Sequence, residues 1–398
     1  FGQQYFEKTA YVNFDNNARM KQVFEGDLDI ERLVLSISAE TGVSIEAENT
    51  LIIFDEVQEV PKALTSLKYF YENAPQYAIV AAGSLLGVAL HQGTSFPVGK
   101  VDFLDLYPLN FREFLCAMGE KQFVSMLDSC DTQMVTVFKT KYIERLREYY
   151  FVGGMPEVVK DFSEKKDYNR VRAIQKNLIN YYQQDFSKHA EIKLVPRLNL
   201  VWNSIPMQLA KENKKYIYGQ VREGSRAKDF ELAIQWLLDC GLIHKVQRIQ
   251  KPDLPLKAYI DFDAFKLFLV DIGLLIAMTD LDAKVIIEGN KIFTEFKGAL
   301  TEQYILQQLI SDVGVIPYYY STQNSKGEID FLVQGKTSVI PIEVKAEENL
   351  KAKSLKAFCE KYQPSYAVRT SMSDYREQDW MTNIPLYAVK WIKNYVNQ

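Results

Sequence analysis

Three short apolar runs in the first third of the chain constrain its fold more than any other feature. They lie at residues 9–15, 51–54 and 78–82, and two stretches with helical spacing, residues 28–39 and 63–71, separate them. Strands that are apolar throughout and joined by helices are typical of a parallel sheet buried on both faces. The sequence therefore predicts an α/β core here.

The elements after this core are predicted from the same kinds of pattern. Residues 101–106 are expected to form one more strand, and Asn110 to be the N-cap of a helix that ends near Met118. Residues 122–189 are expected to be mostly helical, with an interruption at the GGMP sequence of residues 153–156. This part of the chain is predicted to be a helical lid.

Length and composition indicate an ordinary globular protein of two or three domains. The chain has 398 residues, of which 47% are apolar and 25% charged. Its net charge is −4, so a surface for nucleic acid would have to be local. The four cysteines form no CxxC pair, and no apolar run approaches the roughly 18 residues that span a bilayer. We expect a cytoplasmic protein without a membrane partner.

The middle of the chain has the element order of a winged helix. Residues 198–209 and 228–240 are predicted helices, Gly241 suits the end of the second one, and residues 242–249 are a predicted strand. Residues 195–251 hold ten Lys and Arg residues against five acids, which suits contacts with phosphates.

Three cations at the start of the second helix are candidates for binding DNA or RNA, namely Arg222, Arg226 and Lys228. The alternative is a packed module that only spaces its neighbours.

The end of the second apolar run predicts a nucleotide site. Asp55 and Glu56 follow residues 51–54, and a buried parallel strand presents such residues at the sheet edge where ligands bind. Asp55 could hold Mg²⁺ through its water shell and Glu56 could polarise the attacking water, as in a Walker B motif. Ser84, after the third run, could sense the terminal phosphate. The alternative is two acids at an ordinary strand end.

The phosphate loop that should accompany such a site is missing. The sequence contains no GxxxxGK[ST] motif, whose backbone N–H groups and lysine hold the phosphates. Its usual place would be just before Phe1, so we expect a truncated ATPase core. The 398-residue chain is expected to bind ATP weakly or not at all.

A hairpin in the last quarter of the chain predicts a second site. If residues 335–338 form the turn, Asp330 faces Glu343 and Glu328 faces Lys345. Because side chains alternate along strands, these four polar residues share one face. The opposite face would be apolar and consist of Ile329, Phe331, Val333, Ile340, Ile342 and Val344.

Two facing carboxylates repel each other, and a divalent cation between Asp330 and Glu343 would offset that repulsion. Oxygen ligands suit Mg²⁺ or Mn²⁺, and Lys345 could orient a water or stabilise phosphate charge. The preceding helix could add a further acid, with Glu302 preferred over Glu295. The alternatives are a plain Glu328–Lys345 ion pair and a solvated acidic face.

The chain resembles a bacterial family of AAA-type ATP-binding proteins with a C-terminal DUF4143 region, over nearly its whole length. The resemblance rests on LIIFDEVQ (51–58), AAGSLL (81–86), LYPLNFREFL (106–115), YFVGGMPEVV (150–159), QQDFSKH (183–189), IPMQLAKENKK (205–215), KGALTEQYILQQL (297–309), GEIDFLV (327–333) and PIEVKA (341–346).

The family implies an α/β multidomain protein. Its parts would be a P-loop (AAA-type) parallel-sheet core at 1–118, a helical lid at 119–190, a winged helix at 191–285 and a PD-(D/E)XK nuclease-like α/β domain at 286–398. It implies ATP and Mg²⁺ at Asp55, Glu56 and Ser84, and Mg²⁺ or Mn²⁺ in a D…ExK site formed by Asp330, Glu343 and Lys345, with Glu302 as the helix acid. A homo-oligomer is a further possibility.

These features leave two main functions open. One is an ATP-regulated, metal-dependent nuclease, and the other is a nucleotide-switched DNA-binding or signalling protein whose nuclease fold is inactive. Convergence of Asp330, Glu343 and Lys345 in an open groove would favour the first. A Lys345 held by Glu328 beneath a helix would favour the second. A pure ATPase chaperone or motor is a third reading.

Overall fold

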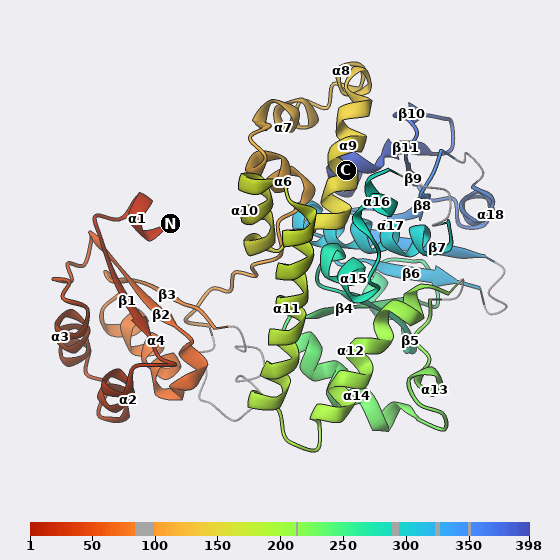
Figure 1. Cartoon of the computed structure of the whole chain (residues 1–398). Helices are drawn as coiled ribbons and strands as arrows, with labels where there is room; N and C mark the ends of the chain where they lie inside the picture. Colours follow the sequence, from red (N-terminus) through yellow and green to blue (C-terminus); the bar gives the residue numbers. More distant parts are fainter. Residues whose placement is uncertain (84–98, 212–213, 289–293, 323–326, 349–351) are drawn as a thin grey trace. The chain divides into compact units, whose positions relative to one another are not determined.

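The computed structural model describes residues 1–83, 99–211, 214–288, 294–322, 327–348 and 352–398 (Figure 1). The chain divides into two compact units, one formed by residues 1–106 with 235–241 and the other by residues 107–234 with 242–398. Each unit is described by itself.

A parallel sheet forms the centre of the first unit. Its described strands are β1 (Lys8–Asn13), β2 (Thr50–Asp55) and β3 (Ala78–Ala81), in the order β1-β2-β3. The helices of this unit are α1 (Gly2–Tyr5), α2 (Ala18–Glu25), α3 (Ile30–Thr41), η1 (Val57–Glu59) and α4 (Pro61–Asn73). The predicted parallel sheet is thus confirmed, with boundaries shifted by one or two residues.

The core of this sheet explains why the apolar runs become strands. Phe14, Phe24 and Phe54 are fully buried, and their rings meet edge to face with centroids 5.3–5.6 Å apart. Such aromatic packing stabilises the fold by more than the burial of apolar area alone.

The strand predicted at residues 101–106 is wrong, since the structure has no regular element there. Phe103, Leu104 and Leu106 are 62%, 92% and 93% exposed, so the apolar pattern finds no sheet to bury it. The next prediction is confirmed. Asn110 caps α6 (Phe111–Ala117) in a reciprocal capping box with Glu113.

Helices make up most of the second unit. They are α6, α7 (Lys121–Asp128), α8 (Thr132–Val137), α9 (Lys139–Val152), α10 (Pro156–Lys165), α11 (Tyr168–His189), α12 (Val195–Leu209), α13 (Tyr218–Val221), α14 (Ala227–Asp239, of which residues 235–239 are assigned to the first unit), α15 (Ile272–Met278), α16 (Ala283–Ile287), α17 (Thr294–Gln308), α18 (Lys353–Tyr362) and α19 (Ile392–Val396). The helical stretch predicted at 122–189 is confirmed, and its break lies at Gly153, which has φ +74°.

One mixed sheet organises this unit. The described strands follow the order β10-β11-β9-β8-β7-β6-β4-β5. Their bounds are β4 (Ile243–Ile249), β5 (Ile260–Leu269), β6 (Tyr318–Ser321), β7 (Glu328–Gln334), β8 (Val339–Val344), β9 (Val368–Ser371), β10 (Arg376–Glu377) and β11 (Thr382–Pro385).

The antiparallel pair β4–β5 belongs to this same sheet, because Arg248 and Ile249 pair in parallel with Tyr319 and Tyr320 of β6. Helix α12, which contacts β5, is followed by α13 and α14, so the predicted order of helix, helix and strand is present.

Candidate functional sites

Asp55 lies at the end of β2, where neighbouring parallel strands end in register. Asn13 of β1 pairs with Asp55 of β2, and Ala82 after β3 donates from its backbone N–H to the carbonyl of Phe54. The Asp55 carboxylate accepts hydrogen bonds from the Tyr11 hydroxyl and from Asn13 Nδ2, the latter at 3.3 Å. The side chain is therefore held at the sheet edge.

Tyr11 and Asn13 are site residues that the sequence analysis missed. A signal was available, because alternate residues of β1 next to the acid-bearing strand are polar. The hydrogen bond to Asp55 raises the pKa of Tyr11 above its ordinary value, so the tyrosine stays a donor at neutral pH.

Glu56 adopts a left-handed backbone conformation with φ +50° and ψ +44°. Non-glycine residues rarely adopt it, and such strain is concentrated at functional sites. Gln58 Nε2 donates to Glu56 Oε2 at 2.5 Å, and Glu56 N donates to Asp55 Oδ1 at 3.1 Å. Both predicted acids thus lie together at one strand end. Ser84 lies outside the described residues.

The register predicted for the C-terminal hairpin is confirmed. Phe331, Leu332, Val333 and Gln334 of β7 pair with Ile342, Pro341, Ile340 and Val339 of β8. The ladder ends at Phe331, one residue before Asp330 would meet Glu343.

A β-bulge interrupts β7 at this point. Tyr318 pairs with Leu332 and Tyr320 with Ile329, so Asp330 and Phe331 together oppose the single residue Tyr319. The prediction that Ile329 shares a face with Phe331 is wrong. The bulge turns Ile329 onto the face of Leu332, where both pack in one cluster with Leu355 and Phe358 of α18.

Glu343 lies on the α18 side of the sheet. It is 4% exposed, and its Oε2 accepts from the backbone N–H of Leu355 at 3.2 Å. Its Oε1 lies 2.7 Å from Lys345 Nζ. The structure therefore brings the predicted pair Glu343 and Lys345 together.

The ion pair between Glu328 and Lys345, considered as an alternative, is wrong. Glu328 instead pairs with Lys266 of β5 at 2.5 Å. Lys266 is fully buried, lies 3.7 Å from Glu302 Oε2, and its ammonium is 4.8 Å from the Tyr319 ring centroid. It is a site residue that the sequence analysis missed. A single lysine in the apolar run of residues 264–270 was the available signal, since a buried charge needs partners.

Glu302 of α17 is the centre of this buried charge cluster, which comprises Lys214, Lys266, Glu302, Glu328 and Asp330. The Glu302 carboxylate is 6% exposed and forms ion pairs with Lys214 and Lys266. Burial by itself raises the pKa of Glu302, but the two ammonium groups outweigh it and lower the pKa below its ordinary value. Glu302 therefore stays ionised. Glu295, the second choice for this role, has no described side chain.

Asp330 joins this cluster rather than Glu343. Its Oδ2 accepts from the backbone N–H of Val344 at 2.7 Å. Burial, and next the charge of Glu302, raise the pKa of Asp330 to about 7. Two of the predicted acids, Asp330 and Glu302, thus lie near one another, while the third is paired elsewhere. Across the part of the chain that the structure describes, no three acidic, histidine or cysteine side chains are arranged to hold a metal ion.

The raised pKa of Asp330 predicts a stability that depends on pH. An unfolded aspartate titrates near pH 3.9, so the folded state binds the proton more tightly. The resulting stabilisation is complete below that pH and is lost as the pH rises through about 7. Between pH 5 and pH 8.5, the free energy of unfolding of Asp330→Asn should therefore rise by at least about 1 kcal/mol relative to that of the wild type. Urea unfolding measures both proteins.

The control for this prediction is Asp253→Asn. Asp253 is exposed and pairs with Lys251, which lowers its pKa, so its titration lies below this pH range. Its stability difference from wild type should not change with pH. An equally flat difference for Asp330→Asn would contradict the prediction.

The three cations predicted to meet nucleic acid are all exposed and close in sequence to the start of α14. Arg222 follows α13, Arg226 directly precedes α14 and Lys228 lies in its first turn. None of them forms an ion pair with a described residue. Other basic residues of this segment point inwards: Lys214 pairs with Glu302, Arg248 with Asp261, and Lys245 lies over the Phe265 ring.

The comparisons with known families cover most of the chain. Residues 1–115 match a family model described as an AAA domain, residues 143–285 match a domain of unknown function (DUF8612), and residues 297–389 match a domain of unknown function (DUF4143). No curated protein matches the chain. Among the described helices, none has the length and apolarity that crossing a bilayer demands.

The parallel sheet with acids at a strand end and the AAA match define an ATPase-type domain of the AAA class. Such domains in general bind ATP with Mg²⁺. The chain belongs to the AAA-type ATP-binding proteins that join this domain to a DUF4143 region.

Proposed function

We propose that this protein is a nucleotide-switched, nucleic-acid-binding protein whose nuclease-like C-terminal domain is not catalytic. The observation that carries the proposal is the Lys266 ammonium, which is fully buried beside Glu302, Glu328 and Asp330. It supplies the positive charge that a divalent cation would otherwise bring to these acids. The bulge at Asp330 and the Glu343–Lys345 ion pair leave the predicted triad divided between two clusters.

The nucleotide half of the proposal rests on Asp55 and Glu56. ATP with Mg²⁺, when bound, supplies a phosphate whose charge differs before and after hydrolysis. Asp55, oriented by Tyr11 and Asn13, would hold the ion through water, and Glu56 would polarise the attacking water. Both Asp55 oxygens already accept hydrogen bonds from protein groups, so the carboxylate is oriented in advance.

The nucleic-acid half rests on Arg222, Arg226 and Lys228. Their exposure without ion pairs within the described chain leaves their charge free for phosphates. A winged helix formed by α12, α13, α14 and the β4–β5 pair would present these cations at the start of its second main helix. Domain boundaries at residues 118, 190 and 285 remain a prediction, as does assembly into a homo-oligomer.

One experiment on the full-length protein tests all of these parts. Binding and cleavage of labelled DNA and RNA are measured in Mg²⁺ and in Mn²⁺, with and without ATP. We expect ATP to change the affinity at least threefold, Asp55→Asn to abolish that change, and the nucleic acid to stay intact. Glu48→Gln, which removes an exposed acid of the same unit, should behave as wild type.

The variants Asp330→Ala and Lys345→Ala test whether the C-terminal domain is a nuclease. Metal-dependent cleavage by wild type that both variants lose would establish the nuclease reading and refute ours. Equal traces of cleavage in all three samples would point to a contaminating nuclease and leave the domain non-catalytic. An ATP effect that Asp55→Asn retains would refute the nucleotide half.

A further inference from the structure

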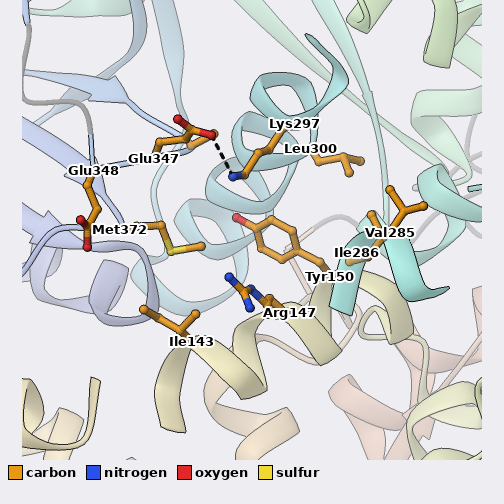
Figure 2. Close-up of a pocket in the computed structure, with 11 residues that line it drawn as sticks. Ile143, Arg147, Tyr150, Val285, Ile286, Lys297, Leu300, Glu347, Glu348 and Met372 are labelled. Carbon is orange, nitrogen blue, oxygen red and sulfur yellow. Dashed lines mark hydrogen bonds and ion pairs between the residues drawn. The ribbon is translucent and has the colours of Figure 1, made fainter. Parts of the chain in front are cut away.

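A cavity of about 380 Å³ lies between α9, α16, α17 and the segment after β8 (Figure 2). All of its lining residues belong to the second unit, and none of them is among the site residues described above. The volume is within the range of small-molecule sites, which are mostly apolar with a few placed polar groups. Ile143, Leu300 and Met372 supply part of the apolar wall.

One cation of the cavity lining has no ion-pair partner among the described residues. Glu347 pairs with Lys297 at 3.2 Å, and Glu348 pairs at 2.9 Å with Lys139, which also pairs with Asp374 at 3.2 Å. Arg147 forms no ion pair with any described residue, and its Nη1 makes only a long bond, of 3.5 Å, to the carbonyl of Ile287. Among the described residues that line the cavity, Arg147 is therefore the charged side chain without an ion-pair partner.

A buried hydroxyl lies beside this guanidinium. Tyr150 is 7% exposed, and among the described groups none reaches hydrogen-bond geometry with its hydroxyl, although Thr301 lies near enough to affect its pKa. Arg147 and Tyr150 are both on α9, and Figure 2 shows the two side chains directed toward the same space, with Lys297 beyond the hydroxyl. A buried polar group without a partner costs stability unless a ligand or water satisfies it.

We propose that this cavity binds a small molecule with an apolar body and one carboxylate. The Arg147 guanidinium can hold a carboxylate through two parallel N–H bonds, and the Tyr150 hydroxyl can donate a third. A single negative charge matches the single unpaired cation. A phosphate monoester, with close to two negative charges, would place its excess beside Glu347 and Glu348 and is disfavoured for that reason. This inference is independent of the proposed nucleotide and nucleic-acid functions.

The proposal is tested with three probes of equal length, namely octanoate, octanol and octyl phosphate, by calorimetry on the intact chain. Octanoate should bind at least tenfold more tightly than either of the others. Arg147→Gln should remove that preference and leave octanol binding unchanged, because only the charge partner is lost. Tyr150→Phe should weaken octanoate a few-fold and leave octanol as it was.

A matched control lies on the same helix. Lys141 is exposed and pairs only with Glu144 among described residues, so Lys141→Gln removes a positive charge of α9 outside the cavity and should leave all three affinities unchanged. An Arg147→Gln variant that unfolds at the same temperature as the wild type would show that the substitution leaves the fold intact. Absent octanoate binding, equal binding by Arg147→Gln, or a preference for octyl phosphate would each overturn the proposal.

Discussion

Lys266→Met is expected to lower the free energy of unfolding by about 3–5 kcal/mol, since it leaves buried carboxylates without their cation. Lys266 is fully buried, and its ammonium lies 2.5 Å from Glu328 and 3.7 Å from Glu302. Burial disfavours the ammonium, but these carboxylates outweigh it and raise the pKa of Lys266 above its ordinary value, so the side chain is charged at neutral pH. Urea unfolding at neutral pH measures the loss.

Two further variants make this result specific. Lys251→Met breaks an exposed ion pair with Asp253 and should leave the free energy of unfolding nearly unchanged. Glu328→Gln added to Lys266→Met should recover part of the loss, because one of the unpaired charges is removed with the lysine. A cost for Lys266→Met no larger than that of Lys251→Met would show that the buried charge cluster contributes little.

The same variant also distinguishes the two readings of the C-terminal domain. With the ammonium gone, Glu328 loses its ion-pair partner and Glu302 keeps only Lys214. These acids are not arranged as a metal site in the wild-type structure, but the loss of one positive charge makes a divalent cation beside their oxygens more favourable. Millimolar Mn²⁺ should therefore raise the melting temperature of Lys266→Met and leave wild type unchanged. An equal rise in both proteins would mean that the wild-type acids already bind the metal, which would revive the nuclease reading.

The sequence was a good guide to the elements that depend on local pattern. The three parallel strands, the Asn110 cap and the pairing of residues 331–334 with 339–342 all follow from apolar runs, a capping residue and a turn of fixed length. These features are set by neighbours in the chain. The family itself could also be predicted, because several short motifs occur in the right order.

The parts of the C-terminal site that were missed depend on contacts between distant residues. The bulge lies where β7 pairs with β6, and nothing in the sequence predicts the register of that pair. It moves Asp330 away from Glu343. Lys266 comes from a strand about sixty residues before its partner Glu328, and Lys214 comes from a loop about ninety residues before its partner Glu302. The only sequence signal of such a long-range ion pair is an isolated charged residue in an apolar run.

Gly154→Ala is the second change with a large expected effect, a loss of about 3 kcal/mol or more. A Cβ at this position would lie 2.1 Å from the Leu109 carbonyl oxygen and 2.8 Å from its nitrogen. Both atoms belong to the backbone, so no side-chain rotation relieves the clash, and overpacking of this kind typically costs 1–3 kcal/mol even in adaptable cores. The close approach is set by a hydrogen bond of 2.7 Å from Leu109 N to Gly154 O.

The turn at Gly154 joins helices that come from distant parts of the second unit. Gly154 N donates to the buried Asp271 carboxylate at 2.6 Å, and the same carboxylate caps α15 through Leu274 N and accepts from Gln307 of α17. Tyr149, at the end of α9, donates to the Leu109 carbonyl and accepts from Gln307. Displacing the turn would therefore break buried hydrogen bonds in addition to the steric cost.

Gly298→Ala is the matched control, because no atom of the described residues, apart from its own stretch of helix, lies within 4 Å of a Cβ built there, and the residue is within α17. That change should stabilise the protein by about 0.5–1 kcal/mol, since alanine favours the helix. Urea unfolding of both variants gives the comparison, and retained affinity for octanoate reports whether α9 and α17 keep their places around the cavity. If Gly154→Ala were as stable as wild type, the hydrogen-bonded turn could not be what holds α9, α15 and α17 as one body. A conformational change driven by nucleotide would then be expected to alter how these three helices pack on one another.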